Sequence, residues 1–204
     1  MIKTKILKIK GDWQEVVDDC RSTVGKPPLG KEPSTDFKRS ILISEHSPIR
    51  DIKVKWLWKD MPHWITVHWV RHKWECFVRT QRTDRTGIDR TKLPQDEPQD
   101  FTGEANAQHL IDTWRKRLCY MASPETREYA EDFKRELYKV EPEIANVLVP
   151  NCVYRCGCPE MNGCSFWGSF IDWCYKLKVD PRLLPIKGRY DFYNEFFNES
   201  GSRE

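Results

Sequence analysis

Two sets of side chains in this sequence have the types and spacing that chemistry requires. The first set is basic: Val70-Arg71-His72-Lys73 is followed a few residues later by Thr80-Gln81-Arg82-Thr83. Guanidinium forks, ammonium groups, hydroxyls and backbone N–H groups are the donors that hold phosphate. The spacing therefore predicts an anion site, and His68 and Arg79 lie beside it in the sequence.

The second set is a cluster of thiols. Cys152, Cys156, Cys158 and Cys164 fall within thirteen residues, and four thiolates satisfy the tetrahedral preference of zinc. Their spacing differs from the paired Cys-x2-Cys of common zinc folds. The main competing hypothesis is nevertheless a zinc or iron–sulfur module. Such a module would recognise nucleic acid through the arginine-rich segment from Arg79 to Arg90.

Each of these residues also has a purely structural interpretation. Arg71 and His72 could be surface charges on a helix, and Arg79 and Arg82 solvated loop charges. Asn162 could cap the helix that follows it.

The elements that must position the basic set are predicted from periodicity. Alternation over residues 3–10 and 52–58 indicates two half-buried strands. Helical spacing predicts helices over residues 13–20, capped by Asp12, and from Ser34 or Thr35 to before Ser47. Residues 60–62 are expected to form a turn, followed by a helix over 63–77 that carries Arg71, His72 and Lys73.

The second half of the chain is predicted to be mainly helical. Residues 80–100 hold almost no apolar side chain and should form a loop. Amphipathic helices are expected over 105–121 and 124–140, as scaffold, then a short helix after residue 142 and an aromatic helix over 166–177. The segment 180–204 reads as turn-rich and then aromatic, a possible divergent tail.

These motifs, together with Glu45-His46-Ser47-Pro48, resemble the flavin-dependent thymidylate synthases in order and spacing. The family pattern is a His-Ser-Pro element, then Arg-His-Arg, then Ser-x-Arg. A second stretch, residues 143–171, resembles a family segment that contains an Asn near the start of a helix, and Asn162 occupies that position. The resemblance implies a divergent member with an α+β fold, a central, mainly antiparallel sheet with long flanking helices, as in the thymidylate synthase-complementing proteins.

The resemblance also implies ligands and roles. Reductive methylation of dUMP to dTMP would use FAD as cofactor and methylenetetrahydrofolate and NADPH as co-substrates, in a homotetramer. The FAD candidates are Arg71, His72, Lys73, Asn162 and His46. The candidates for binding the nucleotide are His68, Arg79, Thr80, Gln81 and Arg82. Alternatives are another pyrimidine nucleotide or an inactive scaffold.

The sequence departs from the family pattern at its cationic positions. Lys73 replaces the last Arg of Arg-His-Arg, so a bidentate fork becomes a point charge. An Arg expected near Asn146, and another expected in the helix after Asn162, are absent. Arg79, Arg85 or Arg155 would have to take their place.

Composition limits the remaining classes. The 204 residues suit one domain, with 39% hydrophobic and 32% charged residues and a formal charge of +3. Because basic and acidic residues are interleaved, a nucleic-acid-binding stripe across the whole surface is not expected. No membrane span or signal peptide is recognisable, so a cytoplasmic location with reduced thiols is the expectation.

Overall fold

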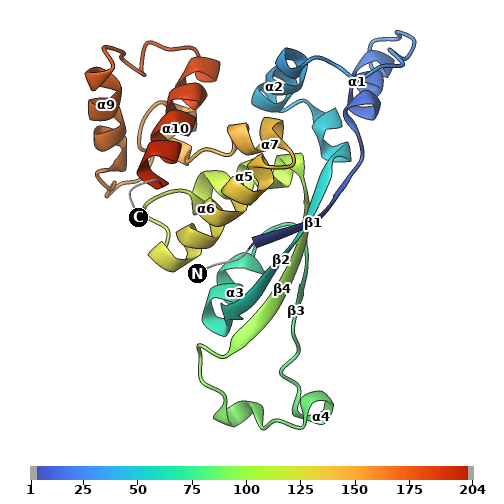
Figure 1. Cartoon of the computed structure of the whole chain (residues 1–204), viewed down its shortest axis with the longest axis vertical. Helices are drawn as coiled ribbons and strands as arrows, with labels where there is room; N and C mark the ends of the chain where they lie inside the picture. Colours follow the sequence, from blue (N-terminus) through green and yellow to red (C-terminus); the bar gives the residue numbers. More distant parts are fainter. Residues whose placement is uncertain (1–3, 202–204) are drawn as a thin grey trace.

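The computed structural model describes residues 4–201, with the side chains of the last two left out, as a four-stranded sheet with helices on one face (Figure 1). The strands are β1 (Thr4–Lys10), β2 (Lys53–Pro62), β3 (Glu75–Val78) and β4 (Pro98–Asn106). The first helices are α1 (Trp13–Ser22), α2 (Thr35–Ser44), the 3-10 turn η1 (Ser47–Asp51), α3 (His63–Trp69), α4 (Thr83–Thr86) and the 3-10 turn η2 (Arg90–Lys92). The later ones are α5 (Ala107–Arg117), α6 (Pro124–Tyr138), α7 (Pro142–Val147), α8 (Asn151–Arg155), α9 (Phe166–Lys176) and α10 (Ile186–Gly201).

The sheet has the order β1-β2-β4-β3, and every neighbouring pair is antiparallel. Side chains alternate between its two faces, so Val54, Trp56 and Trp58 are fully buried while Lys53 and Lys59 are exposed. Gly103 lies opposite Trp56 in the register, where an added Cβ would come within 2.3 Å of the indole. The α+β class with an antiparallel sheet is therefore confirmed.

Helices α5 and α6 cover the buried face of the sheet. Asn106 caps α5 by accepting a hydrogen bond from the backbone N–H of His109 at 2.9 Å, and Ser123 caps α6. Trp114 of α5 packs on Phe133 of α6 with 4.3 Å between ring centroids, and its indole N–H donates to the Ala130 carbonyl. These contacts fix the axis of α5 against the sheet, which matters because α5 also carries much of the site.

The end of the chain packs back onto the body. The guanidinium of Arg189 on α10 donates to the carbonyls of Val153 and Tyr154 in α8, at 2.6 and 3.1 Å. The segment 180–204 was predicted to be turn-rich and then aromatic; its aromatic part forms helix α10, which was not predicted. The predicted strand at residues 3–10 is β1, except that Lys3 lies outside the described residues.

Residues 79–97 form an arm that extends away from the body between β3 and β4 (Figure 1). It carries the short elements α4 and η2, and its ion pair between Arg82 and Asp84, 2.7 Å long, is internal. The arm has no buried side chain. The predicted loop over 80–100 is thus largely present, although its last residues already belong to β4.

The predicted helix over residues 63–77 is wrong beyond Trp69. Helix α3 ends there, a turn follows, and residues from Glu75 onward form β3. The turn allows Trp69 and Trp74 to stack in the core with 5.8 Å between centroids, whereas a continuous helix would separate side chains five residues apart. Tertiary packing of two tryptophans therefore overrides the helical period, and Arg71, His72 and Lys73 lie in a turn.

One further prediction fails nearby, and one strand was missed. Residues 60–62 are part of β2, which continues through a bulge between Trp58 and Met61. Strand β4 was not predicted, because Gly103 and the polar residues around it have low β-propensity. Among the described residues, no helix is long and apolar enough to cross a membrane.

Candidate functional site

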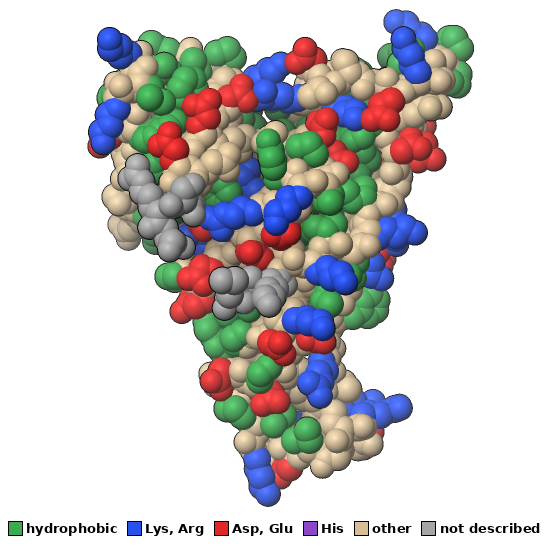
Figure 2. All heavy atoms as spheres, viewed as in Figure 1, with side chains coloured by type: hydrophobic (Ala, Val, Ile, Leu, Met, Phe, Trp, Pro, Cys, Tyr) green, Lys and Arg blue, Asp and Glu red, His purple; other side chains and the backbone are tan. Residues whose placement is uncertain are grey.

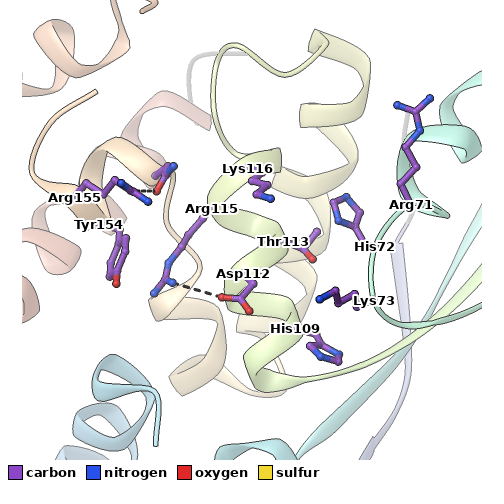
Figure 3. A pocket seen from close by; sticks show the side chains of 11 residues that line it. Arg71, His72, Lys73, His109, Asp112, Thr113, Arg115, Lys116, Tyr154 and Arg155 are labelled. Carbon is purple, nitrogen blue, oxygen red and sulfur yellow. Dashed lines mark hydrogen bonds and ion pairs between the residues drawn. The ribbon is translucent and has the colours of Figure 1, made fainter. Parts of the chain in front are cut away.

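A cationic pocket lies between the turn after α3, one face of α5, and α8 (Figure 3). Its volume is about 420 Å³. We call it the basic pocket, and it is lined by Arg71, His72, Lys73, His109, Asp112, Thr113, Arg115, Lys116, Asn151, Tyr154 and Arg155.

Helix α5 supplies its wall through helical spacing. His109, Asp112, Thr113 and Lys116 recur at intervals of three and four residues, which places them on one face of a helix. The opposite face holds Leu110 and Trp114 in the core. Figure 3 shows His72 and Lys73 facing this wall, while the guanidinium of Arg71 extends away from it.

Two of the pocket's arginines are held by neighbouring groups. The guanidinium of Arg115 pairs with the Glu45 carboxylate, lies 3.6 Å from the Tyr154 ring centroid, and has Asp112 at 3.6 Å. Arg155 donates from Nε to the Asn151 side chain at 3.1 Å. Within residues 4–201, Arg71, Lys73 and Lys116 form no ion pair, so the charges of Lys73 and Lys116 remain available in the pocket.

His72 is uncharged in this setting. Its Nε2 lies 2.8 Å from Nε of Arg117. Burial, together with the positive charges of Arg117 and Lys116, lowers the pKa of His72 to about 4. The pocket therefore combines several cations with one neutral imidazole.

The structure brings only part of the predicted site together. Arg71, His72 and Lys73, the three neighbouring FAD candidates, all line the basic pocket. Asn162 is exposed in the turn before α9 and does not line it. His68 does not line the pocket either: its Nδ1 lies 2.7 Å from the Thr126 hydroxyl, and burial lowers the pKa of the ring.

The predicted nucleotide-binding residues lie in or near the arm. Arg79 follows β3, with its N–H donating to the Asp100 carbonyl. Thr80, Gln81 and Arg82 follow Arg79 in the arm, and Arg82 is paired with Asp84. Within one chain, these residues and the basic pocket form separate sites.

His46 lines a second cavity of about 390 Å³ between α1 and α2. That cavity is largely apolar, with Val24, Phe37, Ile41 and Pro48 in its wall. His46 therefore does not join the other FAD candidates in this structure.

Seven lining residues were not predicted for the site. Helix α5 was assigned to the scaffold, yet its polar stripe faces the pocket. The polar stripe was the only sequence feature that could have indicated these residues. In sequence, however, a polar helix face that lines a pocket cannot be distinguished from one that faces solvent. The unpredicted residues are His109, Asp112, Thr113, Arg115, Lys116, Asn151 and Tyr154, whereas Arg155 was anticipated as a replacement cation.

The thiols do not form a metal site among the residues described. No group of three or more His, Cys, Asp or Glu side chains there could hold a metal ion, and all eight cysteines are free. Cys152 is buried in α8, and its burial raises the pKa to about 12, so it is a neutral thiol. Cys156 lies apart, with its sulfur near the Arg182 carbonyl, while Cys158 and Cys164 belong to the loop before α9. The metal-module hypothesis stays an untested prediction.

Comparison with known proteins assigns the architecture to a fold class. No protein-family model matches the chain, and no curated protein matches it. Among solved structures, the chain shares its α+β fold with a nucleotide methylase. One similar structure is the UMP/dUMP methylase PolB from Streptomyces cacaoi, bound with 5-Br dUMP. The TM-score is 0.58 at 15% identity, over 72% of this chain and 94% of that one, a likeness that shows the fold alone.

Proposed function

We propose that the protein is a divergent, flavin-dependent thymidylate synthase-like enzyme that methylates a pyrimidine nucleotide, with dUMP as the first candidate substrate. The observation that carries this proposal is the basic pocket, formed by Arg71-His72-Lys73 with Lys116 and Arg155 on a fold shared with a UMP/dUMP methylase. The proposal includes FAD as cofactor, with NADPH and methylenetetrahydrofolate as co-substrates.

The charges of the pocket suit a phosphorylated ligand. Five Lys and Arg residues and one acidic residue line it, and four of these five cations have no ion-pair partner within the described chain. A hydrogen bond to a charged group contributes about 1.5 to 3 kcal/mol, so two such bonds correspond to roughly two to four orders of magnitude in Kd. A phosphate would use Lys73, Lys116 and Arg155 in this way.

The donor set also fits the diphosphate of a flavin nucleotide. Lys73, Lys116 and the free end of Arg155 are cationic, and Asn151 adds an amide. A flavin bound there, once reduced by NADPH, would supply the hydride that completes the methyl group. The residues of this chain would bind and orient the two anionic ligands, and none of them is required as a nucleophile.

A second copy of the chain would explain the position of the arm. Thr80, Gln81 and Arg82 lie away from the basic pocket of their own chain, while the arm extends outward with Arg85 and Arg90 exposed (Figure 1). In the proposed homo-oligomer, a tetramer by the family resemblance, an arm could reach the pocket of a neighbouring copy. The basic pocket and the arm would then form one ligand site.

The first experiment is a visible absorbance titration of the purified chain with FAD, without and with dUMP. The expected result is a flavin spectrum that shifts on adding dUMP but not uridine, which lacks the phosphate. Lys116→Met should weaken binding, whereas Lys176→Met, an exposed helical lysine on α9, serves as the matched control. Absence of flavin and nucleotide binding would refute the proposal, and a preference for dCMP would redirect it to another pyrimidine nucleotide.

A further inference from the structure

Arg117 lies behind the basic pocket and contacts it only through His72. It is the last residue of α5, and its Nε–H donates to Nε2 of His72 at 2.8 Å. One terminal nitrogen donates to the backbone carbonyl of His68 at 2.6 Å, and the guanidinium lies 5.8 Å from the Trp69 ring centroid. Arg117 is thus fixed by the helix α3 that precedes His72.

This contact determines where His72 carries its proton. Arginine stays protonated in proteins and has no acceptor, so the nitrogen that faces it must be the acceptor. The acceptor nitrogen of a neutral imidazole leaves its single proton on the other nitrogen. For His72, the proton is therefore on Nδ1.

Nδ1 of His72 is available to a ligand. It has no hydrogen-bond partner within residues 4–201, and it is not among the buried polar atoms that lack one. The ring itself is held between two indoles, with centroids 6.1 Å from Trp69 and 5.0 Å from Trp74. The open volume next to His72 is that of the basic pocket.

The groups around the ring oppose a positive charge on it. Arg117 and Lys116 face it from α5, and Arg71 and Lys73 flank it in the turn. Asp112, the one acidic side chain that lines the pocket, lies 3.6 Å from the guanidinium of Arg115. With the burial of the ring, this environment explains the low pKa of His72.

We propose that Arg117 is a positioning residue that holds His72 as an uncharged Nδ1–H donor in the wall of the basic pocket. The pocket then offers a ligand two kinds of contact: cations for phosphate oxygens, and one neutral donor suited to a carbonyl or phosphate oxygen. The identity of the ligand rests on the proposed function, whereas the state of His72 does not.

The test is NMR of the full chain labelled with 13C and 15N in histidine, with His72 assigned by His72→Gln. In the wild type, His72 is expected to carry its proton on Nδ1 and to stay neutral down to about pH 5. In Arg117→Met, the ring should titrate nearer the ordinary histidine value of about 6.5 and exchange between tautomers. Arg117→Lys keeps a cationic donor and should retain the wild-type tautomer.

A second measurement uses sulfate, whose charge is constant between pH 6 and 8, in the His109→Gln background so that the other imidazole of the pocket is removed. Sulfate affinity should be nearly independent of pH with Arg117 present. With Arg117→Met it should rise by up to about fivefold from pH 8 to pH 6, the effect of one added charge near 4 Å in water.

The inference is overturned if wild-type His72 titrates near its ordinary value or carries its proton on Nε2. It is also overturned if Arg117→Met folds and leaves both properties unchanged. If Arg117→Met does not fold, the tautomer of wild-type His72 and the spectrum of Arg117→Lys still test the inference. None of these NMR results requires dUMP or FAD to bind, so failure of the proposed function would be recognised separately.

Discussion

The Glu45 carboxylate and the Arg115 guanidinium form an ion pair that joins the end of α2 to the wall of the basic pocket. Glu45 lies in the left-handed region at φ 54°, just after α2, and also accepts a hydrogen bond from the Gln108 amide at 2.6 Å. Because both side chains are largely shielded from solvent, this pair is screened less than a surface pair.

Breaking this pair should destabilise the fold. Glu45→Ala is expected to lower the free energy of unfolding by about 2 to 3 kcal/mol, because Arg115 would remain partly buried without its carboxylate. Urea denaturation of Glu45→Ala, Arg115→Ala and the double variant measures the coupling between them. Asp36→Ala, which removes the exposed pair with Lys187, is the control and should cause no measurable change. Additive effects in the double variant would contradict the prediction.

Gly103 supplies a prediction about packing. Gly103→Ala should destabilise the chain by about 1 to 3 kcal/mol, because the new Cβ would overlap the buried Trp56 ring. Gly168 in α9 is the matched control, since nothing lies within 4 Å of an added Cβ there. Gly168→Ala should stabilise the chain by up to about 1 kcal/mol through helix propensity. Thermal denaturation of both variants checks the opposite signs, and a neutral Gly103→Ala would refute the packing argument.

Because of Lys134, the free energy of unfolding should increase as the pH rises above about 7. Lys134 is buried between α6, α7 and α10, where its ammonium donates to the Ala145 carbonyl and the Asn194 side chain. Burial lowers its pKa from 10.5 to about 7. Between those two values the unfolded chain binds more protons, so the free energy of unfolding should increase from about pH 7 toward pH 10.

Lys134→Met should remove this dependence, as measured by urea denaturation between pH 7 and 9.5. Lys176→Met, with an exposed ammonium, should leave it in place. An unchanged pH slope in Lys134→Met would show that another group causes it.

Glu141 should have the opposite effect at lower pH: because of it, the free energy of unfolding should decrease as the pH rises. Burial raises the pKa of Glu141 to about 7, assisted by the neighbouring Glu143 and opposed by the Trp13 indole N–H and by Lys38. The folded chain therefore binds more protons between about pH 4.5 and 7, and stability should fall as pH rises through that window. Glu141→Gln retains an acceptor for Trp13 and should raise the melting temperature at pH 8 but not at pH 4.5. Glu136→Gln, in a more exposed ion pair, is the control, and equal effects of the two variants would argue against the prediction.

Elements that depend on local interactions could be predicted from the sequence, whereas features that depend on contacts between distant residues could not. Strand β1 and helices α1, α2 and α6 were predicted because alternation, helical spacing and caps at Asp12, Ser34 and Ser123 are local signals. The break after Trp69 was not, because it depends on the stacking of Trp74 across a turn. The pocket wall on α5 was missed for the same kind of reason: Lys116 becomes a site residue only because His72 and Arg155 come from elsewhere in the chain to meet it. Figure 2 shows basic and acidic side chains interleaved over the visible face, as composition suggested, so net charge could not locate the pocket.

Among the residues of the basic pocket, Arg155 is expected to contribute most directly to the binding of a phosphorylated ligand. Its Nε is anchored by Asn151, which leaves the terminal nitrogens free to form a bidentate contact with a phosphate. Arg155→Met should weaken dUMP binding by about 10- to 150-fold, the equivalent of one charged hydrogen bond of roughly 1.5 to 3 kcal/mol. Arg155→Lys should recover only part of the loss, because an ammonium lacks the fork. Isothermal titration at two salt concentrations measures both effects, and the affinity of the wild type should fall as salt rises. Arg50→Met, a cation in η1 outside the pocket, is the control. If Arg155→Met binds dUMP as tightly as this control does, the phosphate is held elsewhere, and the arm around Arg82 becomes the first place to search.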